Sequence, residues 1–89
     1  MCVGVTEHFL KRFRQRIAKS KRASIFADRA YCYGVPSDDL RNATLAKEIK
    51  RKEEEYGSTA RVYLNCIYWY RDGRAVTVYP LPQNMHGRA

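Results

Sequence analysis

The spacing of apolar residues changes near Thr59, and this change constrains the fold more than any other feature of the chain. Before Thr59, apolar side chains recur every three or four residues, as on one face of an amphipathic helix. After it, segments rich in Val, Ile, Tyr and Trp alternate as half-buried strands do. The 89 residues leave room for one small domain with a thin core. We therefore expect an α+β fold in which three helices precede a three-stranded antiparallel β-meander.

The first two helices have clear boundaries in the sequence. The first is expected from about residue 6 or 7 to residue 17 or 18, because Thr6 suits an N-cap and apolar residues follow Phe9 at steps of four. The second is expected from about residue 20 or 21 to residue 33. Gly34 is expected to close it in a left-handed conformation.

The third helix is expected over residues 37–56. Ser37 suits its N-cap, and Asp38 and Asp39 suit its first turn, because oxygen atoms and negative charge stabilise a helix N-terminus. Gly57 is expected to end it. The apolar face is sparse, so we expect this helix to be the most exposed of the three.

Three strands are expected in the last third of the chain, over residues 60–64, 66–70 and 74–79. Asn65 marks the first reversal, and the pair Asp72-Gly73 marks the second, because Asp-Gly favours a tight hairpin turn. These connections are too short for crossovers, so the strands should be antiparallel.

Residues 1–82 are expected to form the single domain, with residues 83–89 as a flexible tail. The N-terminus has no basic segment ahead of an apolar core, so we expect no signal peptide. No apolar run approaches the roughly 18 residues of a membrane span. We expect no cofactor, because the sequence contains neither a P-loop nor a GxGxxG motif.

Strand alternation divides the meander into two faces. The face expected to be core carries Val62, Leu64, Ile67, Trp69, Val76 and Val78. The other carries Arg61, Tyr63, Tyr68, Tyr70, Thr77 and Tyr79. Tyrosines among basic groups on an open sheet would form a stacking platform for single-stranded bases. The alternative is that they pack under a helix or a dimer interface.

The charge of the chain is strongly positive and unevenly distributed. Lys and Arg number 17 against 9 Asp and Glu, which gives +8. Residues 1–29 carry +6, residues 30–58 carry −1, and residues 59–89 carry +3. Clustered basic residues favour nucleic acid or another polyanion as a partner. The alternative is a solvated surface that keeps the protein soluble.

The three cysteines suggest a reducing compartment. Cys2, Cys32 and Cys66 form no C-x-x-C pair and are odd in number. We expect three free thiols in a cytoplasmic protein, with Cys32 and Cys66 acting as small core residues. His8 and His86 are far from them in sequence, so we expect no metal site.

His8, Arg12 and Arg16 recur at steps of four and therefore share one side of the first helix. Because they precede the apolar stripe by one position, this basic row should border a groove. Arg binds phosphate oxygens, and a His near its usual pKa can transfer a proton at neutral pH. The alternative is a surface row of snorkelling side chains. Thr77, in the last strand, can offer a hydroxyl to a phosphate.

A basic run connects the first helix to the second. Its residues, Arg14, Arg16, Lys19, Lys21 and Arg22, suit a surface that follows a phosphate backbone, although a solvated loop is the alternative.

Two end motifs resemble a group of small phage and prophage proteins. The segment Val5-Thr6-Glu7-His8, with Arg12 and Arg16 following, resembles their T-x-H-x4-R-x3-R helix. The string AVTVYPLP at residues 75–82 resembles their closing strand. Those proteins are similar in turn to the barnase–EndoU–colicin–RelE superfamily of metal-independent, toxin-like ribonucleases.

The resemblance implies an RNA-directed protein in which His8 transfers a proton and Arg12 and Arg16 hold the phosphate. Thr77 and Tyr79 would contribute from the last strand. The rival interpretation is a non-catalytic module that binds RNA or a host ribonucleoprotein and blocks a defence system. A third is a protein-interaction partner, such as a homodimer formed through the tyrosine face.

Overall fold

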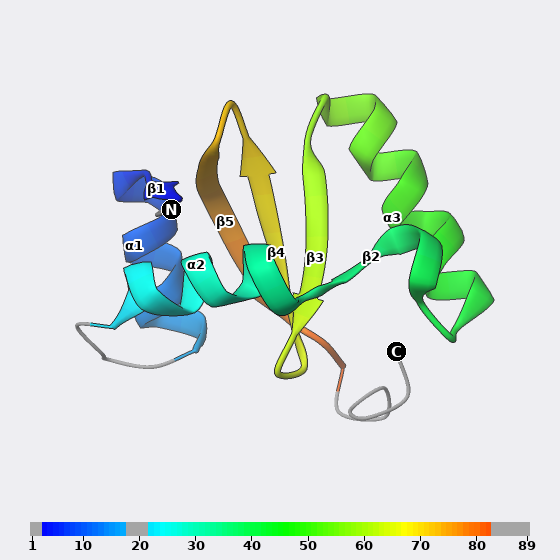
Figure 1. The fold of residues 1–89 in the computed structure, drawn as a ribbon, viewed down its shortest axis with the longest axis horizontal. Coiled ribbons are helices and arrows are strands. Elements are labelled where there is room, and N and C mark those ends of the chain that lie inside the picture. Colours follow the sequence, from blue (N-terminus) through cyan, green and yellow to red (C-terminus); the bar gives the residue numbers. More distant parts are fainter. Residues whose placement is uncertain (1–2, 18–21, 83–89) are drawn as a thin grey trace.

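The computed structural model describes residues 3–17 and 22–82, which form three α-helices, a short 3₁₀ helix and a five-stranded mixed sheet (Figure 1). Several residues with expected roles lie outside this part of the chain: Cys2, Lys19, Lys21 and residues 83–89. The elements follow in the order β1 (Gly4–Val5), α1 (Glu7–Arg16), α2 (Ala23–Tyr33), β2 (Val35–Pro36), η1 (Ser37–Asp39), α3 (Ala43–Tyr56), β3 (Thr59–Tyr63), β4 (Cys66–Arg71) and β5 (Arg74–Pro80).

The sheet corrects the expected three-stranded meander. Strands β3, β4 and β5 do pair antiparallel in succession, but the full order is β1-β5-β4-β3-β2. β1 pairs parallel with β5, and β2 pairs antiparallel with β3. Each added edge strand has two residues, which is too short to produce a periodic signal in the sequence.

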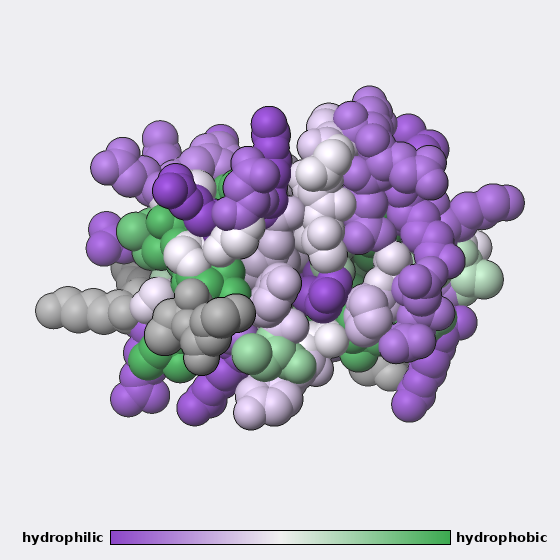
Figure 2. Space-filling view, turned by 45° about the horizontal axis from the view of Figure 1, so that its top comes forward, coloured by the Kyte–Doolittle hydropathy of each residue, from purple (hydrophilic) through white to green (hydrophobic). Residues whose placement is uncertain are grey.

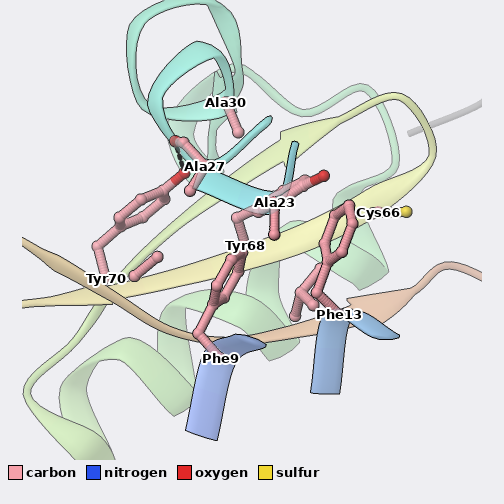
Figure 3. Close-up of a cluster of buried hydrophobic side chains, with 10 residues drawn as sticks. Phe9, Phe13, Ala23, Ala27, Ala30, Cys66, Tyr68 and Tyr70 are labelled. Carbon is pink, nitrogen blue, oxygen red and sulfur yellow. Dashed lines mark hydrogen bonds between the residues drawn. The ribbon is translucent and has the colours of Figure 1, made fainter. Parts of the chain in front are cut away.

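Helices cover both faces of the sheet. α1 and α2 pack on one face, where Phe9 and Phe13 meet Tyr68 in the larger core cluster (Figure 3). Val78 belongs to the same cluster. α2 crosses the front of the sheet in Figure 1 and contacts β1, β4 and β3. On the opposite face, buried residues of α3 and the sheet form a second cluster: Leu45, Ile49, Ala60, Val62, Trp69 and Leu81.

A β-bulge changes which residues of β5 share a face. Trp69 is paired with Thr77, but the next residue, Tyr70, is paired with Ala75, so Val76 is the extra residue. Val76 packs on the α3 side and so shares a face with Trp69, as expected, whereas Val78 packs against α1. The expectation that they share a face is therefore wrong. Thr77 and Tyr79 likewise lie on the α3 side, opposite Tyr68.

The third helix begins later than expected. Ser37 is buried in η1 and donates a hydrogen bond to Glu53 Oε1 at 2.6 Å, so it is not the N-cap. Asn42 caps α3 instead, because its side chain accepts from the Leu45 N–H at 3.0 Å. Glu53 also accepts from the Ala60 N–H, which joins α3 to β3. Hydrophilic residues gather over α3 at the right of Figure 2, in agreement with its expected exposure.

Two further expectations about α2 are wrong. Gly34 has φ −68° and ψ 158°, which is extended and not left-handed. Cys32 is exposed, while Cys66 is buried as expected, and burial raises the pKa of the Cys66 thiol.

The turn between β3 and β4 contains a strained residue. Leu64 and Asn65 both have positive φ, at 48° and 62°, the pattern of a type I′ turn. Leu64 is exposed and gains little from packing. We expect Leu64→Asn to raise the unfolding free energy by about 1 kcal/mol, because Asn adopts the left-handed conformation more readily. Urea denaturation checks this, and Asn65→Leu should shift the midpoint the other way.

Candidate functional site

The junction between α1 and β5 positions His8. Thr6 caps α1 by accepting from the Phe9 N–H at 3.1 Å. Its own N–H donates to the Ala75 carbonyl at 3.1 Å, and its hydroxyl lies 3.3 Å from the same oxygen. The first turn of α1 is therefore fixed to β5, and the exposed His8 projects beside that strand.

A groove of about 590 Å³ lies between α3 and the sheet. Three residues of the expected catalytic set line it, namely His8 from α1 and Thr77 and Tyr79 from β5. The rest of its lining comes from α3, the α3–β3 turn, β4, β5 and the segment after β5: Leu45, Glu48, Ile49, Lys52, Tyr56, Ser58, Ile67, Trp69, Val76, Leu81 and Pro82. The walls are mainly apolar, with a few polar groups among them, which is typical of ligand pockets.

Arg16 lies close to this groove. Its guanidinium carbon is 4.2 Å from the centroid of the Tyr79 ring, a cation–π contact, and its Nη1 donates to the Val78 carbonyl at 3.1 Å. Arg12 is turned along α1, where its Nη1 donates to Gln15 Oε1 at 2.9 Å. The structure thus brings Arg16 to β5 but pairs Arg12 within its own helix.

The groove also contains charged residues that the sequence patterns did not single out. Glu48 and Lys52 line it from α3, one turn apart. In the sequence this pair resembles an ordinary solvated ion pair of a charged helix. Only the packing of α3 over the sheet shows that both border the same groove as His8.

The expected tyrosine platform does not exist. Tyr68 and Tyr70 are only 1% and 3% exposed, because α1 and α2 cover them. The Tyr70 hydroxyl donates to the Ala27 carbonyl at 2.6 Å (Figure 3). Burial raises the pKa of both tyrosines from the ordinary value of 10.0. The alternative of packing under a helix is therefore the one observed.

The expected RNA-binding residues also include Tyr63 and Arg61 of the sheet and two described residues of the basic run, Arg14 and Arg22. Tyr63 is half-buried and packs against the larger core cluster. The guanidinium carbon of Arg61 lies 5.5 Å from the centroid of the Tyr31 ring, and Arg61 Nη1 donates to the Ala60 carbonyl. Arg14 and Arg22 are exposed. None of these four residues lines the groove.

Thr77 carries an unusual hydroxyl. Among the described residues, its Oγ1 is the one buried side-chain oxygen or nitrogen atom without a hydrogen-bond partner. Most buried polar atoms are paired, so an exception at the wall of a groove needs an explanation. Rotation about the Cα–Cβ bond would exchange the positions of the hydroxyl and the methyl group.

Within the described part of the chain, no group of three or more His, Cys, Asp or Glu side chains is arranged to hold a metal ion. Nor is any helix there long and apolar enough to cross a membrane. Comparisons with protein-family models, curated proteins and solved structures found no match to this chain.

Proposed function

We propose that this chain is an RNA-directed protein of the phage type, acting in the cytoplasm as a metal-independent ribonuclease. The observation that supports this best is the convergence of His8, Thr77 and Tyr79 on one groove, with Arg16 against the Tyr79 ring. These residues come from the two end motifs that resemble the small phage and prophage proteins, which are similar in turn to the ribonuclease superfamily. The net charge of +8 suits a polyanionic substrate.

The proposed reaction is attack of a ribose 2′-oxygen on the adjacent phosphorus. The 2′-hydroxyl loses its proton, the O2′–P bond forms, and the P–O5′ bond breaks as the leaving 5′-oxygen gains a proton. His8 performs one of the two proton transfers, and Glu48, which lines the groove from α3, is the candidate for the other. Arg16 and Arg12 stabilise the charge that develops on the phosphate oxygens.

The test is cleavage of end-labelled total RNA in EDTA by the wild-type protein and its variants. We expect His8→Ala to lower the rate about 10²–10⁴-fold, the usual contribution of a general acid or base. RNA retention on a filter should change little, because His8 is exposed and supports no core contact. Glu48→Gln should also slow cleavage, whereas Tyr33→Ala, an exposed change on α2, should not.

Absence of cleavage by the wild-type protein, or loss of cleavage in EDTA, would contradict the ribonuclease proposal. The second candidate is then a non-catalytic module that holds RNA or a ribonucleoprotein and inhibits a host system. One observation favours it: Arg12 donates to Gln15 within α1 and, like Arg16, does not line the groove, so the expected pair of phosphate ligands is not assembled beside His8 there. Salt-dependent RNA retention without turnover would support this module.

A further inference from the structure

We infer that the groove between α3 and the sheet binds one unpaired base of single-stranded RNA. This inference rests on the proposed RNA-directed function and names the part of the substrate that the groove accepts. The base would then stack on the α3 side of the sheet, and not on the tyrosine face, where Tyr68 is buried.

The size and lining of the groove can accommodate a planar aromatic ring. Its volume of about 590 Å³ falls within the range of small-molecule pockets, about 300–1,000 Å³. Trp69 and Ile67 line it from β4. Two tyrosines stand at its border, Tyr56 at the end of α3 and Tyr79 on β5, and their exposed fractions are 59% and 45%. Aromatic side chains with open faces are the groups on which unpaired bases stack.

The few polar groups in the groove can orient such a ring. Within residues 3–17 and 22–82 the Thr77 hydroxyl has no hydrogen-bond partner, so a side-chain rotation would let it bond to a base without breaking another hydrogen bond. The Glu48 carboxylate can accept hydrogen bonds from base N–H groups. A purely apolar occupant would leave the Thr77 hydroxyl unpaired.

The charges beside the groove suit the phosphates on either side of a bound base. Lys52 lines it from α3, and Arg16 lies against the Tyr79 ring on β5. Cations therefore stand on both sides of an apolar groove, in a protein of net charge +8. This complementarity favours a nucleotide segment over an apolar peptide, whose backbone needs no flanking cations.

The position of Trp69 makes the inference directly testable. Trp69 is the single tryptophan of the chain, so its fluorescence reports on the groove alone. The probe is an eight-nucleotide single-stranded RNA of mixed sequence, titrated into the full-length protein. Inorganic polyphosphate of similar charge is the control, because it engages basic residues but carries no base. We expect the RNA, and not polyphosphate, to quench or shift the Trp69 emission.

Two groove variants and one matched control complete the experiment. Tyr56→Ala should weaken RNA binding about tenfold by removing a stacking surface. Thr77→Val, which keeps the shape of the side chain, should weaken it about threefold if the hydroxyl pairs with the base. Tyr33→Ala removes an equally large and 76% exposed tyrosine from the opposite side of the sheet and should change affinity less than twofold.

The outcomes separate this inference from the proposed function. If RNA is retained in a salt-dependent way while Trp69 emission and the affinity of Tyr56→Ala stay unchanged, the base site is refuted and RNA binding stands. An equal response of Trp69 to polyphosphate would also refute it, because phosphate contact alone would explain the signal. If RNA is not retained at all, the proposed function fails and the base site with it.

Discussion

Replacing Phe9 with alanine is expected to lower the unfolding free energy by about 3–5 kcal/mol. Phe9 is completely buried between α1 and the sheet, with its ring centroid 5.9 Å from that of Phe13 and 6.1 Å from that of Tyr68. The substitution loses the free energy gained by burying the ring, and it leaves a cavity that the closely packed neighbours cannot fill. For a domain of this size such a loss is a large part of the total stability.

Urea denaturation followed by circular dichroism measures this loss. Phe9→Leu retains most of the apolar volume, so it should lower the unfolding free energy by less than half as much as Phe9→Ala. Ile25→Ala removes an exposed apolar side chain from α2 and should change stability by less than about 0.5 kcal/mol. A loss for Phe9→Ala no larger than that for Ile25→Ala would mean that α1 does not pack on the sheet as described.

The same contact matters for the candidate site, because α1 carries both the core phenylalanines and the groove histidine. Phe9 and Phe13 hold the helix on one face of the sheet, and Thr6 fixes its first turn to β5. His8 can therefore reach the groove on the other face only because the helix lies at the β5 side of the sheet (Figure 1). Variants that loosen α1 should thus impair any function of His8 indirectly.

Local patterns in the sequence predicted the elements with strong periodicity. The steps of four from Phe9 predicted α1 and its buried residues, and Asn65 and the Asp72-Gly73 pair predicted the turns of the two hairpins. Helix starts were harder, because several polar residues near Ser37 can cap a helix. Hydrogen bonding to Glu53, sixteen residues away, placed Ser37 in the interior instead.

Features that depend on tertiary pairing could not be predicted. The bulge at Val76 reverses the alternation of β5, so Thr77 and Tyr79 changed faces. The sequence left open whether the tyrosine face is exposed or covered, because no local signal shows that the alanine-rich α2 packs on it. The groove residue Glu48 was missed for the same reason, since its position depends on how α3 crosses the sheet.

Replacing Gly34 with alanine is expected to destabilise the protein by about 3 kcal/mol, at the upper end of what overpacking costs. The reason is space and not backbone conformation, because its φ of −68° is open to any residue. A Cβ atom at this position would overlap the Ala30 carbonyl oxygen and would lie 2.9 Å from Arg61 Cβ. The chain passes here from α2 into β2, and the Gly34 N–H donates to that same carbonyl at 2.8 Å.

Gly57→Ala is the matched control, because it separates the effect of backbone conformation at Gly57 from the lack of space at Gly34. Gly57 has φ +61°, and apart from its own local backbone no atom of the described residues lies within 4 Å of the place where its Cβ would stand, so alanine there is strained but not crowded. We expect it to cost about 1 kcal/mol, the penalty of the left-handed conformation. Urea midpoints of the two variants give the comparison. If Gly34→Ala costs no more than Gly57→Ala, the close approach of α2 to β3 is not what requires glycine.

If Gly34→Ala costs more, α2 should be displaced from the sheet. This displacement should expose the Tyr70 hydroxyl, which donates to the Ala27 carbonyl in the wild-type protein. The raised pKa of Tyr70 should then fall toward 10.0, and an ultraviolet titration measures this change.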